Sequence, residues 1–104
     1  MLQTQWKAAA LAGLVTLFSA SAALAERSGS EVYQQFCAAC HNPGILNAPK
    51  PNDAADWQDR LSAGKDTLLA NTISGLQAMP PRGACGNCSD AELKAAIDHM
   101  VGDL

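Results

Sequence analysis

Apolar residues recur every three or four positions along much of this chain, and no segment alternates apolar and polar residues as a strand does. The pattern predicts a few short helices joined by loops. The first helix is capped by Ser28 or Ser30 and leads into Cys37. A loop follows over residues 42–52, because its three prolines and one glycine interrupt a continuous helix. The apolar face of the first helix consists of Val32, Tyr33, Phe36 and Cys40.

A second short helix follows this loop. Asp53 or Asp56 caps its start, and Gly64 is placed to end it. Helical spacing directs Trp57 and Leu61 toward the core.

Two more helices complete the predicted all-α architecture. The third begins near Asp66 and is weakened by Gly75, and the prolines at 80 and 81 stop any continuation. The last begins with a capping box, in which Glu92 reaches back to the amide of Ser89. The apolar stripes are Leu69, Ile73 and Leu76 in the third helix, and Leu93, Ile97, Met100 and Leu104 in the last.

Residues 1–25 have the pattern of a secretory signal peptide. A short basic segment over residues 1–7 precedes an apolar segment over residues 8–20, and Ala23-Leu24-Ala25 forms a small-residue cleavage site. We therefore expect a leader over 1–25 and one domain over 26–104, exported to the oxidising periplasm. The alternative is an uncleaved leader that anchors the chain to the membrane.

Without this leader 79 of the 104 residues remain, close to the lower size at which one hydrophobic core suffices. A covalent crosslink or cofactor is therefore expected. Six of the seven basic residues and all ten acidic residues lie after position 25, so the domain is acidic. This charge argues against nucleic-acid binding and favours basic surfaces on at least one protein partner.

Cys37-x-x-Cys40-His41 is the motif that decides the functional interpretation, because it is typical of covalent attachment of haem c. Two thiols one helical turn apart match the two vinyl groups of a haem. The imidazole of His41 then lies beneath the iron as its proximal ligand. The sequence therefore predicts one covalently bound haem.

A second C-x-x-C pair, Cys85 and Cys88, leaves several alternatives open. It is followed by Ser89 and so lacks the histidine of a second haem site. A zinc ribbon is disfavoured because 44 residues separate the pairs, against about 15 to 20 in the usual spacing. We expect a disulfide that holds the loop around Met79 to the last helix, with a redox-active dithiol as the alternative.

Met79 is the predicted sixth ligand of the iron. Prolines at 80 and 81 restrict the backbone and hold its thioether in an extended loop. Plain core packing is the usual role of a methionine and fits Met100 in the last helix. His99 is a rival ligand, but its place near a helix C-terminus favours an exposed cation. An open sixth position is the remaining alternative.

The second ring nitrogen of His41 also needs a hydrogen-bond partner that fixes the orientation of the ring. Backbone carbonyls of the proline-rich loop are the candidates. We favour Pro49 over Pro43, since Pro43 follows the histidine too closely to fold back.

These motifs resemble those of class I cytochromes c, and within them the small bacterial cytochrome c5 group. The resemblance runs from Gly29-x-x-x-Tyr33 to the C-terminal helix and is most specific over residues 79–90, Met-Pro-Pro-Arg-Gly-x-Cys-x-x-Cys-Ser-Asp. It implies a cytochrome c fold of three to four short helices around one haem, with the terminal helices crossing. It also implies axial His41 and Met79, a Cys85–Cys88 bridge, and Pro49 beside the carbonyl partner of the histidine.

The resemblance further implies that Trp57 contacts a haem propionate, although core packing is an equally good interpretation. Arg60 and Arg82 are weaker candidates for propionate contacts and are expected mainly on the solvated surface. Both axial positions would then be filled, so we expect an electron carrier of relatively high potential rather than an enzyme. Its partners would be redox proteins, and it would meet a membrane only through their complexes or an uncleaved leader. The rival functions are a haem subunit of a larger oxidoreductase and an open-site haem enzyme or sensor.

Overall fold

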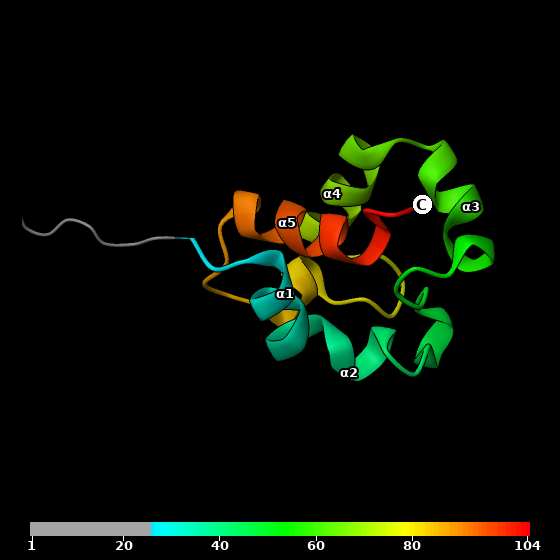
Figure 1. Ribbon diagram of the computed structural model, residues 1–104. Helices are drawn as coiled ribbons and strands as arrows, with labels where there is room; N and C mark the ends of the chain where they lie inside the picture. Colours follow the sequence, from blue (N-terminus) through cyan, green and yellow to red (C-terminus); the bar gives the residue numbers. More distant parts are fainter. Residues whose placement is uncertain (1–25) are drawn as a thin grey trace, which may run out of the picture.

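The computed structural model describes residues 26–104, so the predicted leader over 1–25 lies outside the described part of the chain. Helices and loops make up this part, which contains no strand beyond one isolated bridge between Leu76 and Met79. No helix among residues 26–104 has the length and apolar character needed to cross a membrane. The all-α prediction is confirmed. The α-helices, shown in Figure 1, are α1 (Gly29–Val32), α2 (Ala38–His41), α3 (Ala54–Ser62), α4 (Lys65–Ser74) and α5 (Asp90–Val101).

The helical path from α1 to α2 ends at His41 and includes a π-helical segment, η2 (Tyr33–Cys37). Ser28 caps it through a capping box with Glu31, so Ser28 rather than Ser30 is the N-cap. On the predicted apolar face, Val32 and Tyr33 are buried, whereas Cys40 is exposed. A π-helical segment has a wider turn than an α-helix, so residues beyond it no longer follow the α-helical period.

Short caps define the two middle helices. The Asp53 side chain accepts a hydrogen bond from the amide of Asp56, which identifies Asp53 as the N-cap of α3. Gly64 separates α3 from α4 at a φ of 96°, and Gly75 ends α4 at a φ of 88°. These left-handed backbone values favour glycine at both positions. Before α3, the predicted loop also contains one short 3-10 helix, η3 (Ile45–Asn47).

The last helix, α5, begins with the predicted capping box of Ser89 and Glu92. It crosses α1 where Gly29 lies directly against the backbone of Ala95 (Figure 1). The prediction that Leu104 continues the apolar stripe is wrong. The helix ends at Val101, and Leu104 lies beyond it with 46% of its surface exposed.

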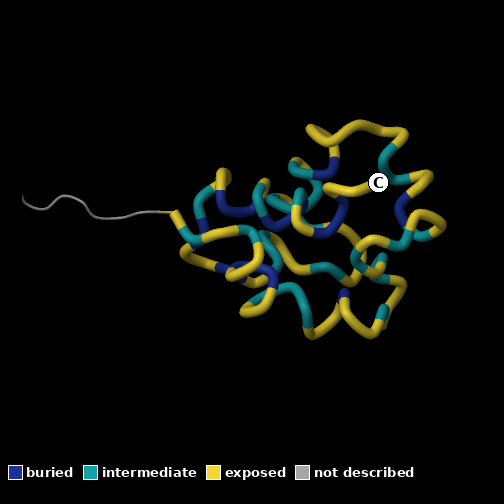
Figure 2. Tube along the Cα trace, in the orientation of Figure 1, coloured by how far each residue is buried: buried dark blue, intermediate teal, exposed yellow. Residues whose placement is uncertain are grey.

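Buried side chains form two clusters, and α5 contributes to both, which makes it the central element of the fold. The buried stretches along the backbone are dark blue in Figure 2. The first cluster joins α5 to α3 and α4. The second joins α5 to α1 and to the cysteine pair that precedes it. The first contains Tyr33, Trp57, Leu68, Ile97, Met100 and Val101; the second contains Val32, Cys85, Cys88, Leu93 and Ala96.

Candidate functional site

A cavity of about 300 Å³ lies between the α2 segment, the proline-rich loop, α4 and α5. Its volume is at the lower end of the range for small-molecule and cofactor sites. Most of its wall is apolar, and the first buried cluster contributes Trp57, Leu68, Ile97 and Met100 to it. Six of the candidate site residues singled out in the sequence line it: Cys37, Cys40, His41, Pro49, Trp57 and Met79.

His41 ends α2 and is buried, with only 7% of its surface exposed. Its Nδ1 lies 2.8 Å from the carbonyl oxygen of Pro49, which is the carbonyl favoured from the sequence over that of Pro43. A carbonyl oxygen only accepts hydrogen bonds, so this contact assigns the ring proton to Nδ1. Nε2 therefore keeps its lone pair available for a metal ion.

Cys37 is the N-cap of α2 and Cys40 lies within this helix, and neither is in a disulfide. Cys37 is half-buried and Cys40 is exposed. Burial raises the pKa of Cys37 to about 11, so its sulfur carries a proton at neutral pH. The pair thus presents two free cysteine sulfurs to one cavity, next to the imidazole of His41.

Met79 reaches the same cavity from a tight turn after α4. Reciprocal backbone hydrogen bonds join it to Leu76, at 3.0 Å and 2.9 Å. Gly75 packs so closely that a Cβ there would lie 3.1 Å from the carbonyl oxygen of Met79. The turn is therefore tied to the end of α4, and the prolines at 80 and 81 continue it as the sequence indicates.

Trp57 is a core residue, with 4% of its surface exposed. Its ring is nearly parallel to that of His41, with centroids 6.3 Å apart and 8° between the planes. Its indole N–H donates to the carbonyl oxygen of Lys50 at 2.8 Å. The core-packing interpretation is therefore confirmed, and the propionate contact stays a prediction.

The two arginines expected mainly at the solvated surface are instead half-buried and bonded to backbone carbonyls. Arg60 lines the cavity and donates to the carbonyls of Asp56 and Asn47. Arg82 donates to the carbonyl of Cys88 and to the carboxylate of Asp90, each at 2.8 Å. Both therefore fix the loops in which their partners lie.

The rival ligands fall where the sequence places them. His99 is exposed and packs against Tyr33 with ring centroids 5.1 Å apart, outside the cavity lining. Met100 is buried in the core and also contributes to the cavity wall. Within residues 26–104, no three His, Cys, Asp or Glu side chains gather into a group that could hold a metal ion.

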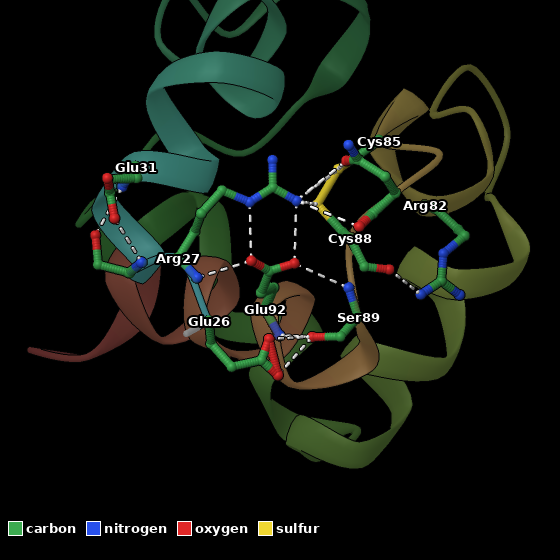
Figure 3. A network of polar contacts seen from close by, with 10 residues as sticks. Glu26, Arg27, Glu31, Arg82, Cys85, Cys88, Ser89 and Glu92 are labelled. Atoms are coloured by element: carbon green, nitrogen blue, oxygen red, sulfur yellow. Dashed lines mark hydrogen bonds and ion pairs between the residues drawn. A yellow bond between two sulfur atoms is a disulfide. The ribbon is translucent and has the colours of Figure 1, made fainter. Parts of the chain in front are cut away.

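Cys85 and Cys88 are joined by a disulfide and are buried, with 0% and 6% of their surfaces exposed. Neither lines the cavity. Arg27 lies beside them and donates to both carboxylate oxygens of the buried Glu92, at 2.8 Å and 3.0 Å (Figure 3). Sequence reasoning missed this ion pair, because the capping role of Glu92 gives no sign of a partner 65 residues away.

Comparison with known proteins identifies the family. The family model described as "Cytochrome C oxidase, cbb3-type, subunit III" matches residues 24–100. Cytochrome c5 of Azotobacter vinelandii is 56% identical over 73% of this chain and 94% of that protein. Cytochrome c5 of Ectopseudomonas mendocina is 46% identical over 81% of this chain and 99% of that protein. The chain belongs to the cytochrome c family, as a small class I member of the c5 type.

Solved structures agree with this c5-type assignment. A mono-haem ferrocytochrome c from Shewanella putrefaciens is 40% identical, with a TM-score of 0.66, and the match covers 74% of this chain and 95% of that one. A cytochrome c in an electron transfer complex with nitrite reductase is 42% identical, with a TM-score of 0.66 over 69% and 88% of the two chains. The relatives of the present chain are electron carriers rather than enzymes, and this cytochrome shares their fold and general role in electron transfer.

A c5-type cytochrome carries one covalently attached haem c, and the described residues fit that group. Two free thiols, an imidazole with an available nitrogen and a thioether all line one apolar cavity. Haem iron accepts histidine and methionine as axial ligands in proteins of this kind. The donor set is therefore chemically appropriate to the cofactor.

Proposed function

We propose that this cytochrome is a periplasmic carrier of single electrons, with His41 and Met79 as the axial ligands of its haem iron. The observation that carries the proposal is the convergence of His41 and Met79, from segments 38 residues apart in sequence, on one apolar cavity. When bound, the haem supplies one-electron exchange between Fe(III) and Fe(II). The chain's own residues hold it, orient it and exclude water.

The haem is assigned to Cys37 and Cys40. Each of the two thiols would hold the haem by adding its S–H across one vinyl group, sulfur bonding to one carbon and hydrogen to the other. The alternative pair, Cys85 and Cys88, is unsuited to this addition because its sulfurs are bonded to each other and lie outside the cavity lining. It is also followed by Ser89 and not by a histidine. We assign this second pair a structural role as a disulfide.

His41 and Met79 are held by different means. The hydrogen bond from Nδ1 to the Pro49 carbonyl fixes the ring of His41 and directs Nε2 to the metal. The tight turn at Leu76 restricts the backbone of Met79. With both axial positions taken, substrates have no access to the iron, and the apolar wall favours the less charged, reduced state.

The proposed location follows from the leader. Cleavage after Ala25 would release a domain that begins at Glu26 in the periplasm. Donor and acceptor are then redox proteins of that compartment. The relative that forms an electron transfer complex with nitrite reductase supports partners of this general kind.

A haem subunit of a larger oxidoreductase is the second candidate function, favoured by the description of the matching family model as an oxidase subunit. Stoichiometric co-purification with a membrane complex from native membranes would support it. Recovery as a free monomer from the periplasmic fraction supports the carrier.

Absorption spectra test the ligand set directly. The ferric protein, matured with haem, is expected to show the weak band near ~695 nm that reports iron bound to a methionine sulfur. Met79→Ala should abolish this band, whereas Met100→Leu, the matched control, should retain it. A high-spin ferric spectrum in the unaltered protein would contradict the proposal and favour an open-site enzyme or sensor.

A further inference from the structure

The chain after Met79 adopts a backbone that its own sequence does not favour. Arg82, Gly83 and Ala84 follow one another at φ values of 59°, 59° and 67°. For residues other than glycine, this left-handed conformation is persistent only where the surroundings impose it. Two hydrogen bonds within the turn, Gly83 to Pro80 and Cys85 to Arg82, are each 3.0 Å long.

The Arg82 side chain connects this turn to the start of α5. Its Nη2 donates to the carbonyl oxygen of Cys88 and to Oδ1 of Asp90, each at 2.8 Å. The Arg82 side chain is 28% exposed and that of Asp90 is 66% exposed, so the contact with Cys88 is the better shielded of the two. Hydrogen bonds from a charged donor are stronger than those between neutral groups.

The acceptor of this bond is itself firmly held. Cys88 is bonded to Cys85 and lies beside the guanidinium of Arg27, which is paired with Glu92 on α5 (Figure 3). Arg27 also donates to the side-chain oxygen of Asn87 at 3.1 Å. Two arginines thus hold the disulfide turn, Arg27 on its connection to the N-terminal segment and Arg82 on its connection to the Met79 turn.

The Met79 side chain lies directly beside the turn that Arg82 holds. A Cβ placed on Gly83 would be 3.8 Å from the Cε of Met79, so a displacement of residues 82 and 83 changes the packing of the thioether. We infer that Arg82 is the positioning residue for the Met79 ligand, acting through its bridge from the turn to the Cys88 carbonyl. This inference rests on the proposed methionine ligation.

Competition by an external ligand measures this positioning. Imidazole binds ferric iron only when Met79 dissociates, so its apparent affinity reports how readily the thioether leaves. Arg82→Gln shortens the side chain and removes the charge, and it should raise the imidazole affinity about tenfold, as expected for the loss of a charge-assisted hydrogen bond. The ~695 nm band should weaken in parallel at neutral pH.

Lys94→Gln is the matched control, since it removes the same charge from an exposed ion pair with Asp98 on α5. This variant should leave both the imidazole affinity and the ~695 nm band unchanged. Arg82→Lys keeps the charge and one donor group, so it should give an intermediate increase of about threefold. If Arg82→Gln does not incorporate haem, the imidazole affinity of Arg82→Lys provides the test in its place.

Imidazole affinities equal to that of the unaltered protein in the Arg82 variants would overturn the positioning role. This result differs from failure of the proposed function. If the proposed methionine ligation is wrong, the unaltered protein itself would lack the ~695 nm band, and Arg82 would have no methionine ligand to position.

Discussion

Glu92 is a buried carboxylate whose charge is stabilised by its neighbours. The Arg27 side chain, the Arg27 amide and the Ser89 amide all donate to it, and together they lower its pKa from 4.5 to about 2. Hydrogen bonds to the charged form of a carboxyl group have this effect generally. The pair also places the first residues after position 25 on α5 and beside the disulfide.

The stability of the domain should therefore depend on pH through Glu92. Its pKa is lower in the folded state, so the stabilisation is complete above the unfolded value near 4.5 and is lost as pH falls toward 2. Glu92→Gln, which retains a side chain suited to the capping box, should lower the urea midpoint at pH 7. The difference between the two proteins should shrink toward pH 2.

Urea unfolding of the haem-loaded proteins between pH 2 and pH 7 makes this comparison. Acid also affects other groups, so the difference between the variants is the informative quantity. A difference that stays constant over the whole range would show that the charge of Glu92 is not the stabilising feature.

At the level of elements, the contact between α1 and α5 depends on Gly29. A Cβ on this residue would overlap the backbone carbonyl of Ala95, which cannot move without shifting α5. Glycine normally costs a helix about 1 kcal/mol relative to alanine. At this crossing glycine is instead the more stable choice, because the absence of a side chain permits the close approach of α1 and α5.

Gly29→Ala should therefore destabilise the domain by about 3 kcal/mol, the upper range for overpacked sites. Gly86→Ala is the matched control, since a Cβ there meets nothing within 4 Å, and its effect should be within about 1 kcal/mol of zero. Chemical denaturation of both variants measures these changes. Equal stabilities would show that α1 can move away from α5 without loss.

Local sequence signals predicted much of this architecture. The capping box of Ser89 and Glu92 and the cap at Asp53 depend on residues three positions apart, so they are visible in the sequence. The π-helical segment that ends at Cys37 has no such local signature. Helix ends were less certain, as Leu104 shows.

In the candidate site, too, residues with a local sequence signal were predicted and long-range contacts were not. Cys37, Cys40 and His41 were identified by their spacing, and Met79 by its prolines. Trp57, Arg60 and Arg82 donate to backbone carbonyls, which carry no sequence identity, so these contacts could not be predicted, and the propionate contact of Trp57 stays a prediction. Long-range contacts to the main chain are visible only in three dimensions.

At the scale of the whole molecule, the first buried cluster and the cavity between the elements are continuous. Leu68, Ile97 and Met100 belong to the first cluster and also face the cavity. The domain over residues 26–104 is of a size at which a hydrophobic core alone gives only a few kcal/mol of stability. The haem therefore completes the apolar interior on which the fold depends.

The chain without haem should consequently lose most of its helical structure. Cys37→Ala/Cys40→Ala removes both attachment points, and its far-UV circular dichroism should show weak helicity without a cooperative thermal transition. Cys40→Ala alone is the control, because one thioether still retains the haem and the fold should persist. A cooperative transition and full helicity in the haem-free double variant would mean that α5 and its two clusters are sufficient for folding. The haem would then bind to a domain that is already folded, and the apolar cavity wall would have to be stable in contact with water.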